Sequence, residues 1–230
     1  MWLPSGENFK AKLLAADGYG SEQEALNVVA WSLLYPELEV KDLKLGSYAG
    51  FQTAAPIPES PFARLDIVVS NAASGVLKPA MEMKLKHWRW CMEINAFALA
   101  LLPQHAAPRM KDGGRIVAMS SLGAYRAIPN YGFVGASKAA LESLVRSLAQ
   151  ELGPRGIRVN TVNAGVVDTD ALGYFPNREA LLAEYAARTP AGPVLTPADV
   201  ANAIYLLCLP EAAMINGTTL FVDGGFAISG

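Results

Sequence analysis

Tyr131 and Lys138 are the residues of this 230-residue chain whose types and spacing most directly suggest chemistry. They stand seven residues apart in the segment 131–152, where alanine and leucine recur every three or four positions and predict a helix. Seven helical steps of about 100° bring the two side chains to within roughly 20° of one another, about 10 Å apart along the axis. Both side chains are therefore expected to face one cleft.

A phenol and an ammonium on one helix face can bind different ligands in one site. A phenol is a poor acid at neutral pH because its pKa is about 10, and a nearby cation eases its ionisation. At about 10 Å this direct effect is weak, so we expect Tyr131 to address a substrate and Lys138 to hold a cofactor hydroxyl. The plain alternatives are an aromatic residue packed at a helix start and a solvated lysine.

Small and polar residues follow three expected strands at the points where those strands end. The ends are Asn71 and Ala72 after the strand at 65–70, Ser120 and Ser121 after 115–119, and the run NAGVVDTDA with Thr169 after 157–162. In open parallel sheets, ligands bind beyond the carboxyl ends of the strands. Small residues let a flat ligand approach the backbone, and hydroxyl and amide groups orient it. The sequence therefore predicts a ligand site at this edge of the sheet.

The composition argues against several other classes of function. A net charge of −2 gives no electrostatic basis for a nucleic-acid or anionic-membrane partner. Two cysteines, Cys91 and Cys208, and two histidines, His87 and His105, do not form a disulfide scaffold or a metal-site pattern. No basic leader and no apolar run of about 18 residues occurs. We expect a cytoplasmic protein with no metal, nucleic acid or membrane partner.

Short apolar runs alternate with longer segments of helical period, which is typical of a parallel sheet with crossover helices. Strands are expected at 11–17, 37–43, 65–72, 114–121, 156–165 and 218–225. Helices are expected at 21–35, at 84–110 with a break at Pro103, at 131–152, and from Pro197 after the cap Thr196. We predict an α/β fold with a doubly wound, mostly parallel, Rossmann-like sheet in a single domain over 1–230, with 1–10 and 45–61 irregular.

Several separated motifs resemble one known family. The chain is similar to the short-chain dehydrogenases/reductases, and within them to the enoyl-acyl-carrier-protein reductases. Most of the superfamily leaves three residues between its active tyrosine and lysine, whereas six separate Tyr131 from Lys138 within SSLGAYRAIPNYGFVGASKAALES, as in the enoyl reductases. The runs NAASG at 71–75 and VVDTDALGYFPNREALL at 166–182 resemble the NADPH-using branch called enoyl reductase III. The similarity covers roughly 62–225 well and 11–43 more loosely.

The resemblance implies hydride transfer from NADPH or NADH to the β-carbon of a 2,3-unsaturated acyl thioester on acyl carrier protein or coenzyme A, in fatty-acid biosynthesis. Tyr131 would donate a hydrogen bond or proton to the developing enolate oxygen, and Lys138 would bind the nicotinamide ribose. Ser121 stands where ketone-reducing relatives keep a catalytic serine and many enoyl reductases keep a second tyrosine. Asn95 matches a helix asparagine that supports the lysine through water. The resemblance also implies a homotetramer.

The resemblance further implies which residues contact the cofactor. Those residues are Asn71 and Ala72 on the adenosine side, Ser120 on the nicotinamide side, Thr169 at the carboxamide or pyrophosphate, and Gly165 and Val167 in the same segment as Thr169. Ser120 and Ser121 could instead cap a turn, and Asn71 and Asn95 could be structural amides that hold loops.

The glycine-rich turn that follows the first strand of this family is not found in the sequence. The run ADGYGSEQ contains Gly18 and Gly20 but not the pattern Thr-Gly-x-x-x-Gly-x-Gly. The distance to Asn71 fits better if 11–17 is the second strand of the family, in which case the first strand, the glycine loop and the first helix would be missing. Alternatively, Gly18 and Gly20 form a degenerate turn.

Two acidic residues are expected to bind the adenosine half of the cofactor. If 11–17 is the second strand, Asp17 ends it and would accept hydrogen bonds from the ribose, and Asp42 falls near the adenine. In the alternative with the degenerate turn, Asp42 takes the place of the acidic partner. Asp17 favours NADH, while the resembled branch favours NADPH.

Three functions stay open at the level of the sequence. The first is an enoyl-thioester reductase, which the spacing of Tyr131 and Lys138 favours. The second is a carbonyl reductase that uses Ser121 together with Tyr131. The third is a catalytically silent or truncated member of the family, which the absent glycine pattern favours.

Overall fold

The structure, a computed structural model, describes residues 65–169, 172–173, 175, 177–192 and 194–229. The expected strands 11–17 and 37–43, the expected helix 21–35 and the irregular stretches 1–10 and 45–61 lie outside these residues. Asp17 and Asp42 lie outside them as well, so their roles stay predictions.

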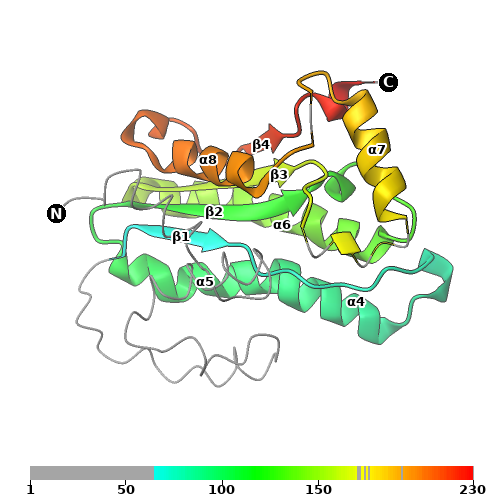
Figure 1. The fold of residues 1–230 in the computed structure, drawn as a ribbon. Coiled ribbons are helices and arrows are strands. Elements are labelled where there is room, and N and C mark those ends of the chain that lie inside the picture. Colours follow the sequence, from blue (N-terminus) through cyan, green and yellow to red (C-terminus); the bar gives the residue numbers. More distant parts are fainter. Residues whose placement is uncertain (1–64, 170–171, 174, 176, 193, 230) are drawn as a thin grey trace, which may run out of the picture.

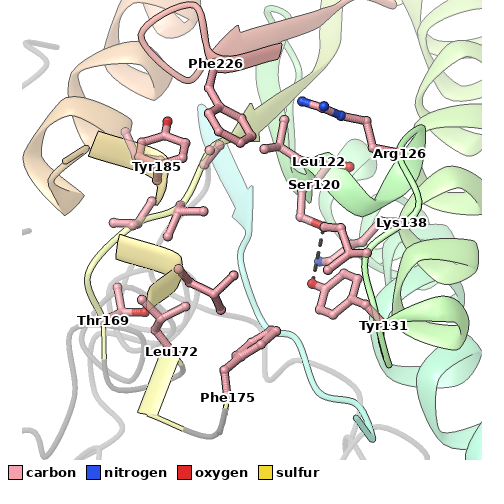
Figure 2. A pocket seen from close by; sticks show the side chains of 18 of the residues that line it. Ser120, Leu122, Arg126, Tyr131, Lys138, Thr169, Leu172, Phe175, Tyr185 and Phe226 are labelled. Carbon is pink, nitrogen blue, oxygen red and sulfur yellow. Dashed lines mark hydrogen bonds between the residues drawn. The ribbon is translucent and has the colours of Figure 1, made fainter. Parts of the chain in front are cut away.

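Four parallel strands form one sheet in the described part of the chain, in the order β1-β2-β3-β4 (Figure 1). The strands are β1 (Ile67–Ser70), β2 (Gly114–Ser121), β3 (Ile157–Ala164) and β4 (Thr219–Val222), each within an expected run. The register aligns their carboxyl ends, because Ser121 pairs with Ala164 and Ala164 pairs with Val222. This shared edge opens on the pocket shown in Figure 2.

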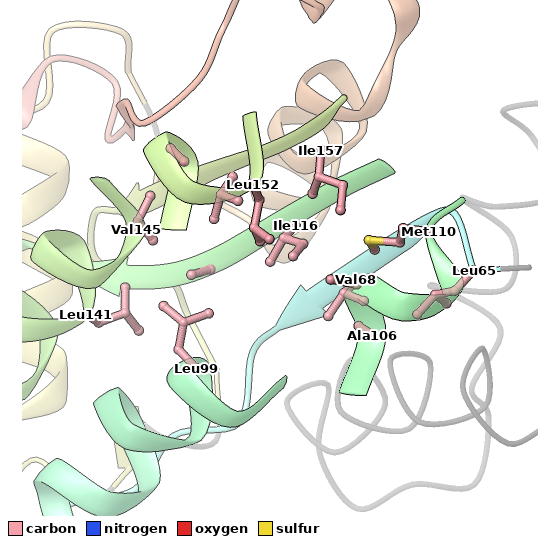
Figure 3. Packing of buried hydrophobic residues seen from close by; sticks show 14 residues of the cluster. Leu65, Val68, Leu99, Ala106, Met110, Ile116, Leu141, Val145, Leu152 and Ile157 are labelled. Carbon is pink, nitrogen blue, oxygen red and sulfur yellow. The ribbon is translucent and has the colours of Figure 1, made fainter. Parts of the chain in front are cut away.

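Helices cover both faces of the sheet. On one face, α5 (Ala98–Ala106) and α6 (Gly132–Leu152) pack against β2 in a buried cluster that includes Leu99, Leu141 and Ile116 (Figure 3). The other face holds a second cluster to which α8 (Pro197–Cys208) contributes. β2 and β3 are therefore buried from both sides, which explains their nearly continuous apolar runs. This arrangement confirms the doubly wound, Rossmann-like fold.

The segment from 84 to 110 departs from the expected break at Pro103. It consists of α4 (Leu85–Met92), a π-helical turn (Glu93–Phe97), and α5, which continues through Pro103. Pro103 lies in the last turn of α5, where the loss of one backbone hydrogen bond does not end the helix. The irregularity falls instead at the π turn, a feature often associated with functional sites.

Helices α6 and α8 begin close to the expected residues, whereas α7 (Arg178–Arg188) was not predicted. α6 begins at Gly132, one residue later than expected, with Tyr131 as its N-cap. Thr196 caps α8 with a reciprocal pair of hydrogen bonds to Asp199, and these bonds hold the pKa of Asp199 below its usual value. The other elements are short 3-10 turns at Ala80–Glu82, Ala107–Arg109, Leu122–Ala124, Gly153–Arg155, Pro210–Ala212 and Phe226–Ile228.

Two further searches cover only the described residues. None of the helices there combines the length and the apolar character that crossing a bilayer requires. The same residues contain no cluster of three or more His, Cys, Asp or Glu side chains arranged to hold a metal ion.

Candidate active site

A cavity of about 460 Å³ lies at the carboxyl edge of the sheet, a size typical of small-molecule sites. Its walls come from the ends of β2 and β3, the loop that enters α6, and helices α7 and α8. The predicted site residues that line it are Asn71, Ser120, Ser121, Tyr131, Lys138, Gly165, Val167 and Thr169. The structure therefore brings together side chains from all three expected strand ends.

Tyr131 and Ser121 are hydrogen-bonded to each other, with 3.3 Å between the phenolic and hydroxyl oxygens (Figure 2). Burial raises the pKa of Tyr131, and proximity to Cys91 acts in the same direction, while the bond from Ser121 opposes both. The phenol is therefore protonated at neutral pH and is available as a hydrogen-bond donor. Its ring stacks on Phe175, with 6.1 Å between the centroids.

Gly123 explains how Tyr131 can lie so close to the end of β2. A Cβ at Gly123 would come within 2.5 Å of the Tyr131 ring. No real Cβ tolerates such a contact, so any larger residue here would displace the phenol from Ser121. The Tyr131 ring therefore packs directly against the Leu122–Ala124 turn.

Lys138 is a buried cation with an incomplete set of partners. Its residue surface is 5% exposed, and Nζ donates a hydrogen bond of 2.8 Å to the carbonyl of Met119 in β2. Burial lowers the pKa of Lys138 to about 8. An ammonium has three N–H donors, and Met119 takes the only hydrogen bond that Nζ forms with the described residues. Two donors therefore remain for a ligand in the cavity.

A carboxylate in α6 connects the ends of β2 and β3. Glu142 Oε1 accepts a hydrogen bond of 2.6 Å from Ser120 Oγ and one of 2.9 Å from Asn163 Nδ2. Asn163 Nδ2 also donates to the backbone carbonyl of Ser121 at 2.9 Å. The Ser120 hydroxyl, which we expected on the nicotinamide side, therefore bonds to the protein itself. The network fixes the backbone that carries Ser121.

Two predicted site residues do not line the cavity. Ala72 is half-buried beside it. Asn95 is buried in the π turn, where its amide bonds to the backbone N–H and carbonyl of Ser74, at 2.8 Å each, and to Ser137 Oγ at 2.8 Å. These bonds join the loop after β1 to α6, and the support of Lys138 by Asn95 through water stays a prediction.

Gly165 lies where any side chain would collide with the far wall. A Cβ there would fall 2.0 Å from the hydroxyl of Tyr185, which is buried in α7 and donates a hydrogen bond to the Asp223 carbonyl at 2.8 Å. Burial, together with the nearby Asp223, raises the pKa of Tyr185 to about 12. Two residues further on, Val167 forms a bridge with Leu195 that closes this wall.

Several residues that line the cavity were not predicted from the sequence. Arg126 and Phe226 lie together at one end of the cavity in Figure 2, away from Leu172 and Phe175. Arg126 follows the Ser120–Ser121 strand end by only a few residues, a position that could have singled it out. Phe226 carried no such signal, because it reaches the site through a contact with residues about a hundred positions earlier in the chain.

Comparison with known proteins shows the family to which this chain belongs. The family model described as enoyl-(acyl carrier protein) reductase matches residues 50–227. A 1-cyclohexenylcarbonyl-CoA reductase from Streptomyces collinus is 41% identical over 167 residues, which are 72% of this chain and 60% of that protein. The enoyl-acyl-carrier-protein reductase (NADH) FabI of Escherichia coli (strain K12) is 36% identical over 137 residues, 60% of this chain and 52% of that protein. The chain thus spans less than two thirds of the length of either relative.

A solved structure shows the same fold. A 7α-hydroxysteroid dehydrogenase, complexed with NADH and 7-oxo glycochenodeoxycholic acid, aligns with a TM-score of 0.66 and 36% identity. The alignment covers 70% of this chain and 64% of that one. The chain therefore belongs to the enoyl-(acyl carrier protein) reductase family, within the short-chain dehydrogenases/reductases.

Proposed function

We propose that this protein reduces the 2,3-double bond of an enoyl thioester with NADPH or NADH. The observation that carries the proposal is the pairing of Tyr131, a half-buried and protonated phenol, with Lys138, a buried cation, on the wall of one largely apolar cavity. The six residues between them agree with the spacing of the enoyl reductases.

Tyr131 would stabilise the charge that develops on the substrate. Addition of hydride to the β-carbon of an enoyl thioester places negative charge on the thioester oxygen. A preorganised donor in a site that excludes water stabilises such an oxyanion far more than water does. The Tyr131 hydroxyl, oriented by Ser121 and seated on Gly123, is the donor for that oxygen.

The cavity residues fit the nicotinamide half of the cofactor. Lys138 has two N–H donors left for the ribose hydroxyls, and Thr169 and Asn71 add polar groups at the cavity wall. Gly165 lines the same wall and has no room for a side chain, because a Cβ there would collide with Tyr185. When bound, the reduced nicotinamide supplies the hydride. The adenosine half would depend on Asp17 and Asp42, which lie outside the described residues.

The acyl portion of the substrate would lie against the apolar wall. Leu172, Phe175 and Leu181 line the cavity, and Phe175 covers the ring of Tyr131. Such a wall excludes water from the reacting double bond. The Streptomyces relative is named for a coenzyme A thioester and FabI for an acyl carrier protein thioester, and we propose either carrier for this chain. Fatty-acid biosynthesis, a cytoplasmic location and a homotetramer stay predictions.

Consumption of reduced nicotinamide tests the reaction. The full chain is mixed with NADPH or NADH and crotonyl-coenzyme A, and the loss of nicotinamide absorbance is followed. We expect turnover with at least one cofactor and its near-complete loss in Tyr131→Phe. Absence of turnover with both cofactors, or equal rates for wild type and Tyr131→Phe, contradicts the proposal.

A carbonyl reductase is the second candidate, favoured by the hydrogen bond between Ser121 and Tyr131. In that case a serine hydroxyl and a phenol together would bind a ketone oxygen. Replacing Ser121 by alanine separates the two functions. An enoyl reductase that relies on Tyr131 should lose activity only a few-fold, whereas a carbonyl reductase should lose about a hundredfold or more. A panel of β-ketoacyl thioesters and simple ketones provides the second arm.

A catalytically silent or truncated member of the family that has lost dinucleotide binding is the third candidate. Calorimetric titration of the full chain with NADPH and with NADH distinguishes it from the other two. Binding of either cofactor refutes the silent form, and weaker binding in Lys138→Met places that cofactor in the cavity.

A further inference from the structure

Arg126 is an unbalanced cation at one end of the cavity. It lies in the loop between β2 and α6, and its side chain lines the cavity beside Phe226 (Figure 2). Its Nη1 atom is buried and has no hydrogen-bond partner among the described residues, and Arg126 forms no ion pair with any of them. A guanidinium stays charged at every physiological pH, so burial cannot neutralise it. The residue as a whole is half-buried, and a charge that is taken partly out of water is stabilised by a polar or anionic partner.

The contact with Phe226 stabilises Arg126 only in part. The Arg126 Cζ lies 5.3 Å from the centroid of the Phe226 ring, a cation–π distance. A ring face attracts the cation but offers no hydrogen-bond acceptor to the N–H groups in the guanidinium plane. The contact therefore positions Arg126 and leaves its directional donors for another group.

The neighbouring charges do not neutralise Arg126. Arg188 lies over the same ring at 4.8 Å, and it is paired with Glu184 at 2.9 Å and donates to the Ser229 carbonyl at 3.3 Å. This end of the cavity thus carries two guanidinium groups and one carboxylate among its lining residues. Among the described lining residues of this end, one positive charge is therefore left without a negative one.

We propose that Arg126 and Phe226 form an anion subsite, which binds a carboxylate or phosphate group of the acyl thioester. The assignment of the ligand as a thioester rests on the proposed function. An apolar cavity at whose end Arg126 forms no ion pair with the described residues complements a molecule with an apolar body and one anionic group. Arginine binds both anions through two parallel N–H bonds.

The anion has two chemical sources. One is a phosphate of the carrier arm, which coenzyme A and acyl carrier protein share. The other is a carboxylate at the far end of the acyl chain, which would make the enzyme selective for dicarboxylic acyl thioesters. Both anions would accept the same pair of N–H bonds from Arg126. They differ in the direction in which the acyl chain would run through the cavity.

Calorimetric titration of the full chain distinguishes these sources. The probes are octanoyl-coenzyme A, octanoyl-pantetheine, which has no phosphate, and the pantetheine monothioester of octanedioic acid. With a phosphate at the subsite, Arg126→Gln should weaken octanoyl-coenzyme A binding by about tenfold or more and leave octanoyl-pantetheine unchanged. With a carboxylate, only the octanedioic thioester should weaken to that extent. An equal loss for all three probes, or no loss for any, overturns the proposal.

A gain of affinity provides a test that does not depend on the tolerance of Arg126 to substitution. Glu184→Gln removes the carboxylate that neutralises Arg188, so binding of the anionic probe should tighten by about two- to fivefold, as expected for a partly exposed pair. Arg126→Lys keeps the charge and should retain part of the affinity. Arg146→Gln changes an exposed arginine on α6 and should leave binding unchanged. Weaker binding in Glu184→Gln contradicts the subsite.

Small anions separate the subsite from the proposed function. If wild type binds none of the thioesters, the proposed function fails. Arg126-dependent binding of octanedioate or inorganic pyrophosphate would then still support the subsite, and its absence would overturn it. Titration with NADPH completes the test, because a loss of NADPH affinity in Arg126→Gln would assign Arg126 to the cofactor and overturn the proposal.

Discussion

The phenolic oxygen of Tyr131 lies 3.3 Å from the hydroxyl oxygen of Ser121, which joins the start of α6 to the end of β2. The two residues are ten positions apart, and the Leu122–Ala124 turn between them brings their oxygens together. Next to this contact, the Met119 carbonyl accepts a hydrogen bond from the ammonium of Lys138, and the Ser121 carbonyl accepts one from the side-chain amide of Asn163. The last residues of β2 are thus the frame on which the candidate site is built.

Replacement of Tyr131 by phenylalanine removes only the hydroxyl. We expect kcat to fall by about 10²- to 10⁴-fold, because a positioned proton donor contributes that much. Cofactor affinity should stay unchanged, since Lys138 still lines the cavity. Steady-state kinetics and calorimetry measure the two effects. Tyr125→Phe is the matched control, because Tyr125 is 51% exposed and packs on Phe221 outside the cavity; a similar loss of kcat there would count against the assignment.

The activity should decline as pH rises through about 8. Burial lowers the pKa of Lys138 to about 8 and raises that of Tyr131, so the lysine is the first of the two to lose its proton. A neutral amine binds ribose hydroxyls less well than an ammonium. The pH profile of kcat/KM reports groups of the free enzyme. Tyr131→Phe should keep the decline in its residual activity and Lys138→Met should lose it; a wild-type profile that is flat up to pH ~10 contradicts the prediction.

Stability should respond to Lys138 with the opposite sign. The folded-state pKa of about 8 lies below the ordinary 10.5, so between these values the unfolded chain holds a proton that the folded chain lacks. The free energy of unfolding therefore rises with pH in that window, and the group contributes no pH dependence below about 8. Urea unfolding of wild type and Lys138→Met across the window measures the difference. Wild type should gain relative to the variant, and a constant difference would rule this out.

Loss of the Glu142 carboxylate should loosen the end of β2. Glu142→Leu leaves the Ser120 hydroxyl and the Asn163 amide without their acceptor, so we expect a loss of about 2–4 kcal/mol in the free energy of unfolding and a lower kcat. Glu142→Gln retains an acceptor oxygen and should recover part of both. Glu151→Leu, at an exposed position of the same helix, is the control. Equal effects at the two positions would mean that the network does not matter.

The sequence predicted those parts of the fold that local patterns determine. The four described strands and helices α6 and α8 follow from apolar periodicity and capping residues, which act within a few positions. The π turn at Glu93–Phe97 was not predicted. It satisfies Asn95, whose partners Ser74 and Ser137 are 21 and 42 residues away. The wrong position for the break shows that tertiary hydrogen bonds, and not Pro103, set the geometry of that segment.

The residues of the candidate site likewise include some that local sequence patterns predicted and others that they did not. Tyr131, Lys138 and Ser121 were predicted because their spacing is a local pattern. Glu142 and Arg126 were missed, because their significance depends on partners that the fold supplies, namely the strand ends for Glu142 and the Phe226 ring for Arg126. Residue types alone do not distinguish such charges from solvated ones.

Transfer of deuterium tests the proposed reaction most directly. The full chain is incubated with crotonyl-coenzyme A and with NADPH or NADH that carries deuterium at the transferable position of the nicotinamide, and the thioester is analysed by mass spectrometry and NMR. We expect butyryl-coenzyme A with deuterium at the β-carbon, and none of this product with Tyr131→Phe in the same time. Unlabelled or unreduced thioester with both cofactors, together with transfer of deuterium to the carbonyl carbon of acetoacetyl-coenzyme A, would contradict enoyl reduction and establish the carbonyl reductase instead.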